Sequence, residues 1–249
     1  MKTYLLQLII IVAISGSALQ AQPTVGLLKY EPGQQNGYVL FAPMSSTSTF
    51  LISKEGRKVK SWQSAYKPGK SAYLLPDGSL LRSGNFGNKY FRSPGNGGII
   101  ERFDWDGKLT WNYQLSDSIQ CQHHDIRPLP NGNILAVVCE VKSREQAIRV
   151  GRLPERTDKI VYSEKIVEIK PEGKSGKIVW EWKVWDHLVQ ENDPSLTNYG
   201  KVSEHPELVH VNFINPASGD EIDWLHINSV AYNPELDQII VSSYNFNEI

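Results

Sequence analysis

The sequence contains little cysteine, little methionine and no excess of charge of either sign. Two cysteines among 249 residues are too few for a disulfide-rich scaffold or for a cysteine-based zinc cluster. The 26 Lys and Arg residues against 27 Asp and Glu residues give a formal net charge of −1. Because a nucleic-acid-binding protein needs a basic excess to offset phosphate charge, this balance argues against that class of partner.

Aromatic residues are abundant by comparison. Seven Trp and eleven Tyr stand against two Met, and aromatic side chains suit the half-buried faces of β-sheets. The hydrophobic fraction of 40% and the charged fraction of 21% are typical of a chain that folds around an ordinary core. The composition therefore predicts a β-rich globular protein.

The N-terminal segment has the features of a secretory signal peptide. Lys2 precedes an apolar run over residues 5–14, small residues follow from Ser15 to Ala18, and Ala21 lies at the expected break. We predict that residues 1–21 are removed, and that residues 22–249 form a periplasmic or secreted domain without membrane insertion. A buried N-terminal helix is the alternative. No cysteine lies near the cleavage point, so a lipid anchor is not expected.

Two kinds of segment alternate along the rest of the chain. The first is a hairpin with a turn between apolar strands, at residues 73–81, 126–135 and 230–240. The second is a turn glycine followed by a strand that carries Trp, at residues 54–62, 105–111 and 176–180.

The spacing of these segments indicates a structural repeat. The Pro-Asp-Gly and Pro-Asn-Gly turns begin at residues 76 and 130, and the first two turns of the Trp segments begin at residues 54 and 105. A period near fifty residues, with about four strands in each, is typical of a β-propeller. A β-sandwich without repeats is the alternative.

Two further features bear on the architecture. Residues 185–222 lack strand alternation and read as a long insert with one short helix, of the kind that often lies at the mouth of a propeller. Residues 245–249 resemble the start of another strand. We therefore expect an incomplete ring of about four blades, in a chain that continues beyond this sequence.

The two cysteines flank the second hairpin. A two-residue turn at Asn131-Gly132 would place Cys139 opposite His124 and not opposite Cys121. Direct bridging would then need a bulge or another register. We predict two unpaired or conditionally paired thiols.

Two polar clusters lead into equivalent hairpins. Residues 122–125 read Gln-His-His-Asp, and residues 223–229 read Asp-Trp-Leu-His-Ile-Asn-Ser. Equivalent strands of a propeller converge on the central channel, so His124 and His226 could face one pocket and bind an anion, move a proton or act as nucleophiles. Their spacing is not that of a zinc helix. The alternative is that both clusters are turns in which polar side chains bond the backbone.

Several glycine-containing segments do not form a nucleotide site. Residues 69–71 and 173–175, both Gly-Lys-Ser, echo the end of a phosphate-binding loop, but Ser64 and Glu168 stand where its leading glycine is needed. The stretch from residue 84 to residue 98 reads as an irregular loop. We expect no cofactor and no metal.

The two polar clusters, together with residues 37–43 and 49–52, resemble the bacterial arylsulfate sulfotransferases. The resemblance runs from about Gly26 to Ile249 and implies a six-bladed propeller exported to the periplasm. It also implies transfer of a sulfuryl group from an aryl sulfate to a phenol through a histidine intermediate, without a nucleotide sulfate donor.

The resemblance also implies roles for individual residues. His124 and His226 match histidines that stabilise sulfate oxygens and protonate the departing phenolate, so we expect them to be catalytic. We expect His123, Tyr244 and Asn228 to bind substrate. Tyr244 follows Ser242-Ser243, where the family has its sulfate-binding arginine. The family's nucleophilic histidine falls beyond Ile249, so this segment alone is not expected to complete the reaction.

Other functions stay open at this point. A non-catalytic propeller that binds a glycan or a protein is favoured by Tyr244 and by the missing nucleophile. A metal-assisted hydrolase is a third hypothesis. Asp125, Asp223 and Asn228 either orient the histidines or close turns. The substrates are expected to be small molecules, and a homodimer is possible.

Overall fold

The structure, a computed structural model, describes residues 27, 29, 31, 33, 35–91, 95–157, 159–213 and 223–249. The predicted signal peptide, residues 1–21, lies outside the described residues. The described chain is nearly all β, with one short α-helix, α2 (Arg144–Arg149). No helix in this part of the chain has the length and apolar character needed to span a membrane.

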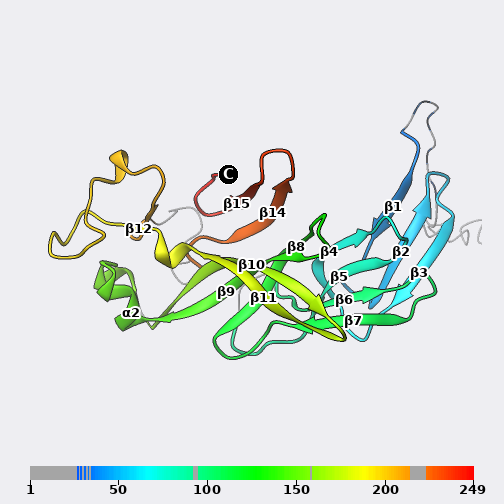
Figure 1. Cartoon of the computed structure of the whole chain (residues 1–249), viewed down its shortest axis with the longest axis horizontal. Coiled ribbons are helices and arrows are strands. Elements are labelled where there is room, and N and C mark those ends of the chain that lie inside the picture. Colours follow the sequence, from blue (N-terminus) through cyan, green and yellow to red (C-terminus); the bar gives the residue numbers. More distant parts are fainter. Residues whose placement is uncertain are drawn as a thin grey trace, which may run out of the picture.

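The strands form successive antiparallel sheets, in which neighbours in sequence are also neighbours in space (Figure 1). The first sheet contains β1 (Tyr38–Phe41), β2 (Ser48–Ser53) and β3 (Lys58–Gln63). The second contains β4 (Pro68–Leu74), β5 (Leu80–Asn85), β6 (Gly98–Phe103) and β7 (Leu109–Gln114). The third contains β8 (Gln120–Pro128), β9 (Ile134–Ser143), β10 (Ile160–Glu172) and β11 (Ser175–Lys183). The fourth contains β14 (Ile227–Asn233) and β15 (Gln238–Ser243).

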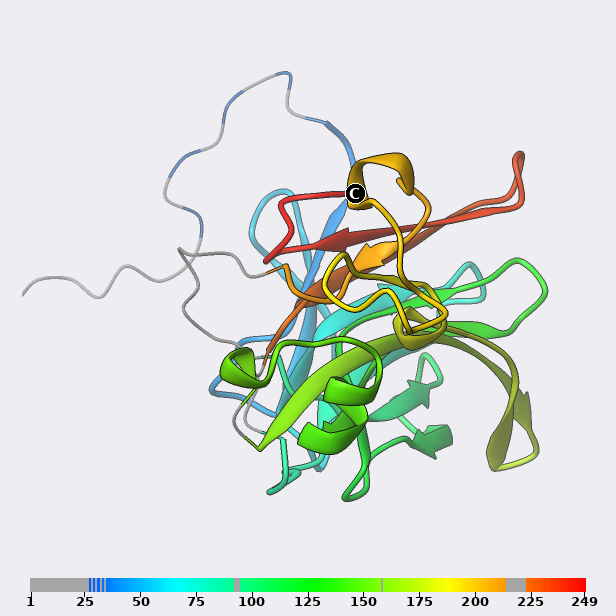
Figure 2. The ribbon, with the colours of Figure 1, turned by 90° about the vertical axis from the view of Figure 1, so that its left-hand side faces the viewer.

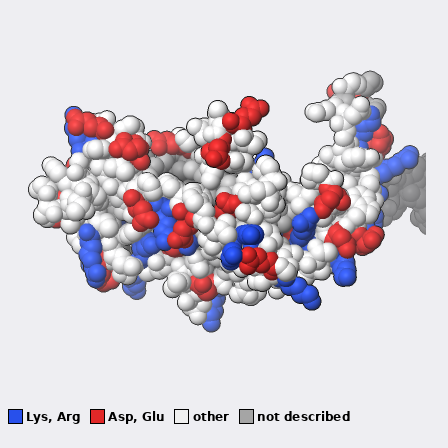
Figure 3. All heavy atoms as spheres, viewed as in Figure 1, with Lys and Arg blue, Asp and Glu red and all other residues white. Residues whose placement is uncertain are grey.

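This order confirms the predicted fold class. The second and third sheets are four-stranded meanders, as in propeller blades, and the described sheets do not close into a ring. The arrangement is that of an incomplete β-propeller. Acidic and basic side chains are interspersed on the face shown in Figure 3, in keeping with the balanced net charge.

The predicted hairpins are confirmed, and two of them share one turn geometry. In the β4–β5 turn the N–H of Gly78 donates to the carbonyl of Leu75, and in the β8–β9 turn Gly132 donates to Leu129. Gly78 and Gly132 have φ of 81° and 86°. A turn that ends in this left-handed conformation favours glycine, which is why the Asp-Gly and Asn-Gly pairs stand there.

Most of the hydrophobic core lies between successive sheets. Leu51 and Trp62 of the first sheet pack with Leu80 and Phe103 of the second. A larger cluster joins the second sheet to the third, and another joins the third to β14 and the insert. Face-to-face packing of neighbouring sheets is how a propeller buries apolar surface.

The repeated tryptophan has a definite role in this packing. Trp62 and Trp111 lie on the last strands of the first and second sheets and are buried. Their indole N–H groups donate to the carbonyls of Asp104 and Ser175 in the following sheet, at 2.9 and 2.5 Å. The tryptophan therefore fastens one blade to the next, and a buried indole needs such an acceptor.

The described part of the insert after β11 contains little regular structure. It holds two short 3₁₀ helices, η2 (Val184–Asp186) and η3 (Val202–Glu204). It also holds a parallel pair of two-residue strands, β12 (Leu188–Val189) and β13 (Val209–His210). Figure 2 shows the insert on the same side of the molecule as β14 and β15. The helix α2, in the β9–β10 connection, was not expected from the sequence.

The predicted register of the β8–β9 hairpin is wrong. Gln122 pairs with Val138 and Ile126 with Ala136, so β8 has two more residues than β9 between these pairs. This bulge brings Cys121 directly opposite Cys139 and leaves His124 without a cross-strand partner. Both cysteines are buried free thiols, and burial raises the pKa of each.

Candidate functional site

The bulge in β8 carries the first histidine cluster. Residues 123–125 lie between the last regular pair before the bulge and the first one after it. His124, in the middle, has a φ of 48°, a left-handed conformation that is uncommon for residues other than glycine. The bulge turns His123 into the protein, where 2% of it is exposed, and leaves His124 partly exposed.

A glycine loop closes against the His124 ring. The N–H of His124 donates to the carbonyl of Gly95 at 2.8 Å. A Cβ atom on Gly95 would lie 2.3 Å from Cε1 of His124, and the φ of Gly95 is 86°. Only glycine meets both conditions, so Gly95 supports the imidazole from beneath.

His123 connects His124 to a buried carboxylate. Nδ1 of His123 lies 2.9 Å from Nδ1 of His124, and Nε2 of His123 lies 3.1 Å from Oε1 of Glu164 on β10. Glu164 is 1% exposed, and both of its oxygens accept the N–H of Ile227. A continuous row therefore runs from Glu164 through His123 to the His124 ring.

The second motif reaches the same point from the fourth sheet. The rings of His124 and His226 are 4.8 Å apart between centroids. Nδ1 of His226 lies 2.6 Å from Oδ2 of Asp223, so the carboxylate holds the orientation of this ring. The ring of Tyr244 lies 5.3 Å from that of His226, and Tyr244 is 59% exposed.

The predicted residues are thus largely brought together. His123, His124, His226 and Tyr244 form a row of successive ring contacts. Asn228 stands in the bulge of β14 and accepts a hydrogen bond from the Ser242 hydroxyl at 2.6 Å. No hydrogen bond between Asn228 and the histidines occurs in the described part of the chain.

Asp125 bonds the framework around the histidines. Its Oδ1 accepts from the Tyr73 hydroxyl on β4 and from the N–H of Ile126. Its Oδ2 accepts the N–H of Val230 on β14, at 3.1 Å. Asp125 therefore ties β4, β8 and β14, the first strands of three sheets, and this keeps the two histidine motifs side by side.

The electrostatic setting favours a neutral His124. Burial, followed by the neighbouring charges of His123 and His226, lowers the pKa of His124 to about 3. Burial also raises the pKa of Glu164 above the ordinary carboxyl value, because ionisation in a dry interior is unfavourable. Neutral imidazoles beside a proton-accepting carboxylate can pass protons to and from a bound molecule.

Two residues of the site, Glu164 and Gly95, were not predicted from the sequence. Glu164 lies on β10 in a run of strand residues and has no motif of its own. Gly95 belongs to a stretch that the sequence predicts to be an irregular loop. Glu164 could have been suspected from the sequence, because it is a charged residue within a strand that is otherwise rich in apolar residues.

The histidine cluster does not coincide with a metal-binding group of side chains or with the cavity of about 860 Å³. Among the described residues, no group of three or more His, Cys, Asp or Glu side chains could hold a metal ion. A cavity of about 860 Å³ lies at the other end of the same strands, against the hairpin turns, lined by residues that include Pro76, Arg127 and Tyr232. The histidines do not line that cavity.

Comparison with known proteins gives one family. The sequence pattern of the arylsulfotransferase (ASST) family matches residues 72–249. The chain is 25% identical over 241 residues to an arylsulfate sulfotransferase, AssT, of Escherichia coli O6:H1, strain CFT073. That alignment covers 90% of this chain and 36% of the relative, so the chain spans about a third of the length of the relative it matches.

One solved structure is also similar. It is a crystal structure of a protein of unknown function from Bacteroides caccae, with 12% sequence identity and a TM-score of 0.43. The match covers 83% of this chain and 50% of that chain.

Proposed function

The chain belongs to the arylsulfotransferase family, and we propose that it takes part in moving a sulfuryl group from an aryl sulfate to a phenol. The observation that carries the proposal is the meeting of His124 and His226, from two sheets, at 4.8 Å between ring centroids. Two imidazoles at this separation are suited to act on one small substrate.

The reaction has two proton steps. In the first, a histidine nitrogen bonds to sulfur as the bond between sulfur and the donor's bridging oxygen breaks, and the departing phenolate takes a proton. In the second, the oxygen of the incoming phenol bonds to sulfur as the nitrogen–sulfur bond breaks, and the phenol gives up its proton. One imidazole that donates a proton in the first step and accepts a proton in the second balances the two steps. Such proton transfer raises the rate roughly 10²–10⁴-fold. We propose a histidine as the intermediate carrier of the sulfuryl group, as the resemblance implies.

His226 is the residue we assign to these proton steps. The Asp223 carboxylate at 2.6 Å fixes the proton on Nδ1 and stabilises the imidazolium that forms when Nε2 is protonated. Nε2 is then the atom that meets the bridging oxygen. The side chain of His226 is 12% exposed, enough to reach a bound ester.

His124 and His123 form a second proton path in this proposal. With Glu164 ionised, His123 directs Nε2–H toward the carboxylate and accepts from Nδ1–H of His124, so Nε2 of His124 is a base. With Glu164 protonated, both imidazoles take the other tautomer and Nε2 of His124 becomes a donor. The raised pKa of Glu164 makes the two states closer in free energy. His123 then acts through His124.

Tyr244 and Asn228 are proposed to contact substrate at the edge of the row. Tyr244 is exposed beside His226, where its hydroxyl can donate one hydrogen bond and its ring can stack on an aryl group. Asn228 lies on β14, two residues after His226, which directly precedes this strand. We also propose that residues 1–21 export a propeller domain to the periplasm, which fractionation of cells would test.

The test follows release of 4-nitrophenolate from 4-nitrophenyl sulfate by the full-length protein, with and without added phenol. Phenol-dependent release is expected, and His226→Ala and His124→Ala are each expected to lower kcat by about 10²–10⁴-fold. His205→Ala, at an exposed histidine paired with Glu207, is the matched control. Release without phenol would indicate hydrolysis instead.

A non-catalytic binding propeller is the second candidate. Tyr244 favours it, because a phenol supplies no charge where the family has an arginine. Absence of release with every aryl sulfate tried, from a protein that is folded by circular dichroism, would support this alternative and overturn the transferase.

A further inference from the structure

The first strand of the second sheet repeats the bulge of β8. In β4, Pro68 pairs with Gly84 and Ala72 with Arg82, so four steps along β4 match two along β5. In β8, the steps from Gln122 to Ile126 match two along β9 in the same way. Lys70 therefore occupies in β4 the place that His124 occupies in β8.

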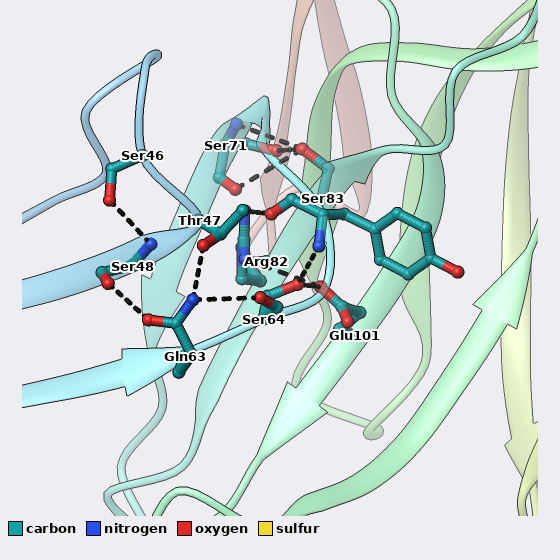
Figure 4. A network of polar contacts seen from close by, with 10 residues as sticks. Ser46, Thr47, Ser48, Gln63, Ser64, Ser71, Arg82, Ser83 and Glu101 are labelled. Atoms are coloured by element: carbon teal, nitrogen blue, oxygen red, sulfur yellow. Dashed lines mark hydrogen bonds and ion pairs between the residues drawn. The ribbon is translucent and has the colours of Figure 1, made fainter.

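The backbone of Lys70 is strained in the same sense as that of His124. Its φ is 95°, where residues with a Cβ are uncommon and glycine is favoured. The bulge is held firmly, because the N–H of Ser71 donates to Oγ of Ser83 at 3.2 Å (Figure 4). A glycine would adopt this conformation without strain, so the lysine side chain is the feature that needs an explanation.

A glycine loop links the two bulges. A Cβ atom on Gly69 would lie 2.9 Å from Cα of Gly97, and Gly95 of the same loop supports the His124 ring. Lys70 thus projects from a backbone that packs directly on the loop beneath the histidine. It is exposed, and it makes no ion pair or hydrogen bond with any described residue.

The charge of Lys70 acts on the histidine row. Its positive charge is among the causes that lower the pKa of His124, after burial and the two neighbouring histidines. An aryl sulfate is a monoanion, whereas the fold holds His124 neutral and Tyr244 is a phenol and not a cation. A permanent cation is therefore the group that the row lacks for binding a sulfate ester.

We propose that Lys70 is a substrate-binding residue that pairs with the sulfate oxygens of the donor beside His124. The proposal rests on the proposed function for its substrate class. Its geometric basis is the shared bulge, the left-handed backbone and the unpaired, exposed ammonium group. Lys70 would supply the positive charge for the sulfate oxygens that Tyr244 does not supply.

The test compares Lys70→Met, Lys70→Arg and the matched control Lys67→Met, which removes an exposed charge three residues earlier in the chain. With 4-nitrophenyl sulfate and phenol, Lys70→Met should raise KM for the donor by about tenfold, the effect of losing one charge-assisted hydrogen bond. Lys70→Arg should stay within about threefold of the parent. KM values for Lys70→Met equal to those for Lys67→Met would overturn the proposal.

Binding of inorganic sulfate, followed by calorimetry, separates this proposal from the proposed function. If the parent shows no turnover, weaker sulfate binding by Lys70→Met still supports Lys70 as an anion ligand, and equal binding overturns it. If turnover is present and unaffected by Lys70→Met, only the Lys70 proposal fails.

Lys70→Gly gives a second readout that a structural role would not produce. It relieves the left-handed backbone and should raise Tm by a few degrees while weakening sulfate binding as much as Lys70→Met does. A lower Tm together with unchanged sulfate binding would show that the lysine serves the fold, and would overturn the proposal.

Discussion

Two of the buried carboxylates in the described part of the chain, Glu101 and Glu164, differ in the groups that lie beyond their partners. Glu101 on β6 faces the guanidinium of Arg82, with Nη1 3.6 Å from Oε2. Glu164 on β10 faces the imidazole of His123 at 3.1 Å. All four side chains are at most 3% exposed.

The Glu101 pair is closed within the fold. Figure 4 shows it among polar side chains between the first two sheets, where Oγ of Ser64 donates to Glu101 at 2.7 Å and Nη2 of Arg82 donates to the carbonyl of Tyr66. Burial raises the pKa of Glu101 and lowers that of Arg82, but a guanidinium keeps its proton in proteins. The pair therefore carries fixed charges and holds the β3–β4 connection against the second sheet.

The Glu164 pair is open at one end. Beyond His123 lies the partly exposed ring of His124, and beyond that the ring of His226. An imidazole exchanges protons near neutral pH, so a charge change at Glu164 can be passed to a group that meets solvent. The partner, and not the burial of the carboxylate, separates a structural pair from one suited to catalysis.

Arg82→Met is expected to have the largest effect, a loss of stability of the folded state. It leaves Glu101 buried without a cation, and loss of one partner of a buried pair costs about 3–5 kcal/mol of stability. Urea denaturation measures the loss. Arg102→Met, which breaks the exposed pair with Asp77, is the control and should cost less than about 1 kcal/mol. Equal effects of the two changes would contradict the structural role of Arg82.

Glu164→Gln should affect turnover more than stability. The amide oxygen can still accept the N–H of Ile227, but the amide takes no proton from His123. We expect kcat to fall about 100-fold, the lower end of what acid–base catalysis contributes, with KM for the donor nearly unchanged. Glu140→Gln, at a carboxylate paired with Lys142 and Lys165 in the same sheet, is the control. An unchanged kcat would remove Glu164 from the proton path.

The smallest effect is a pH dependence of stability at His124. Its pKa falls from 6.5 to about 3 on folding, so the unfolded chain binds the proton first on acidification. Stability from this group is complete above pH 6.5 and is lost as the pH falls toward 3. Raised carboxyl pKa values, as at Glu164 and Asp125, act in the opposite direction.

The variant His124→Asn isolates the histidine contribution, because asparagine tolerates a left-handed backbone. Relative to the parent, it should gain about 1 kcal/mol between pH 7.5 and pH 4, less than the full pKa shift implies, since the ring is partly open to water. Urea denaturation at both pH values measures the difference, and His205→Asn is the control. A difference that does not change with pH would show that His124 is not held neutral by the fold.

Much of the fold was predictable because its signals are local. The Pro-Asp-Gly and Pro-Asn-Gly turns specify hairpins through the left-handed glycines Gly78 and Gly132. Trp62 and Trp111 mark the last strands of two sheets at a fixed place in the repeat. These features depend on a few neighbouring residues, so the propeller architecture could be inferred without coordinates. The histidine motifs could also be named, since each is continuous in sequence.

Local patterns were enough to predict the turns, the strand pattern and the candidate histidines. The folded structure was needed to show that β8 is bulged, that His123 faces inward toward Glu164, and that Lys70 and His124 occupy matching positions. A bulge and a buried charge pair are stabilised by residues from other strands and sheets. The Glu164 carboxylate accepts a hydrogen bond from the N–H of Ile227, which is 63 residues further along the chain, and no local sequence pattern specifies such a contact.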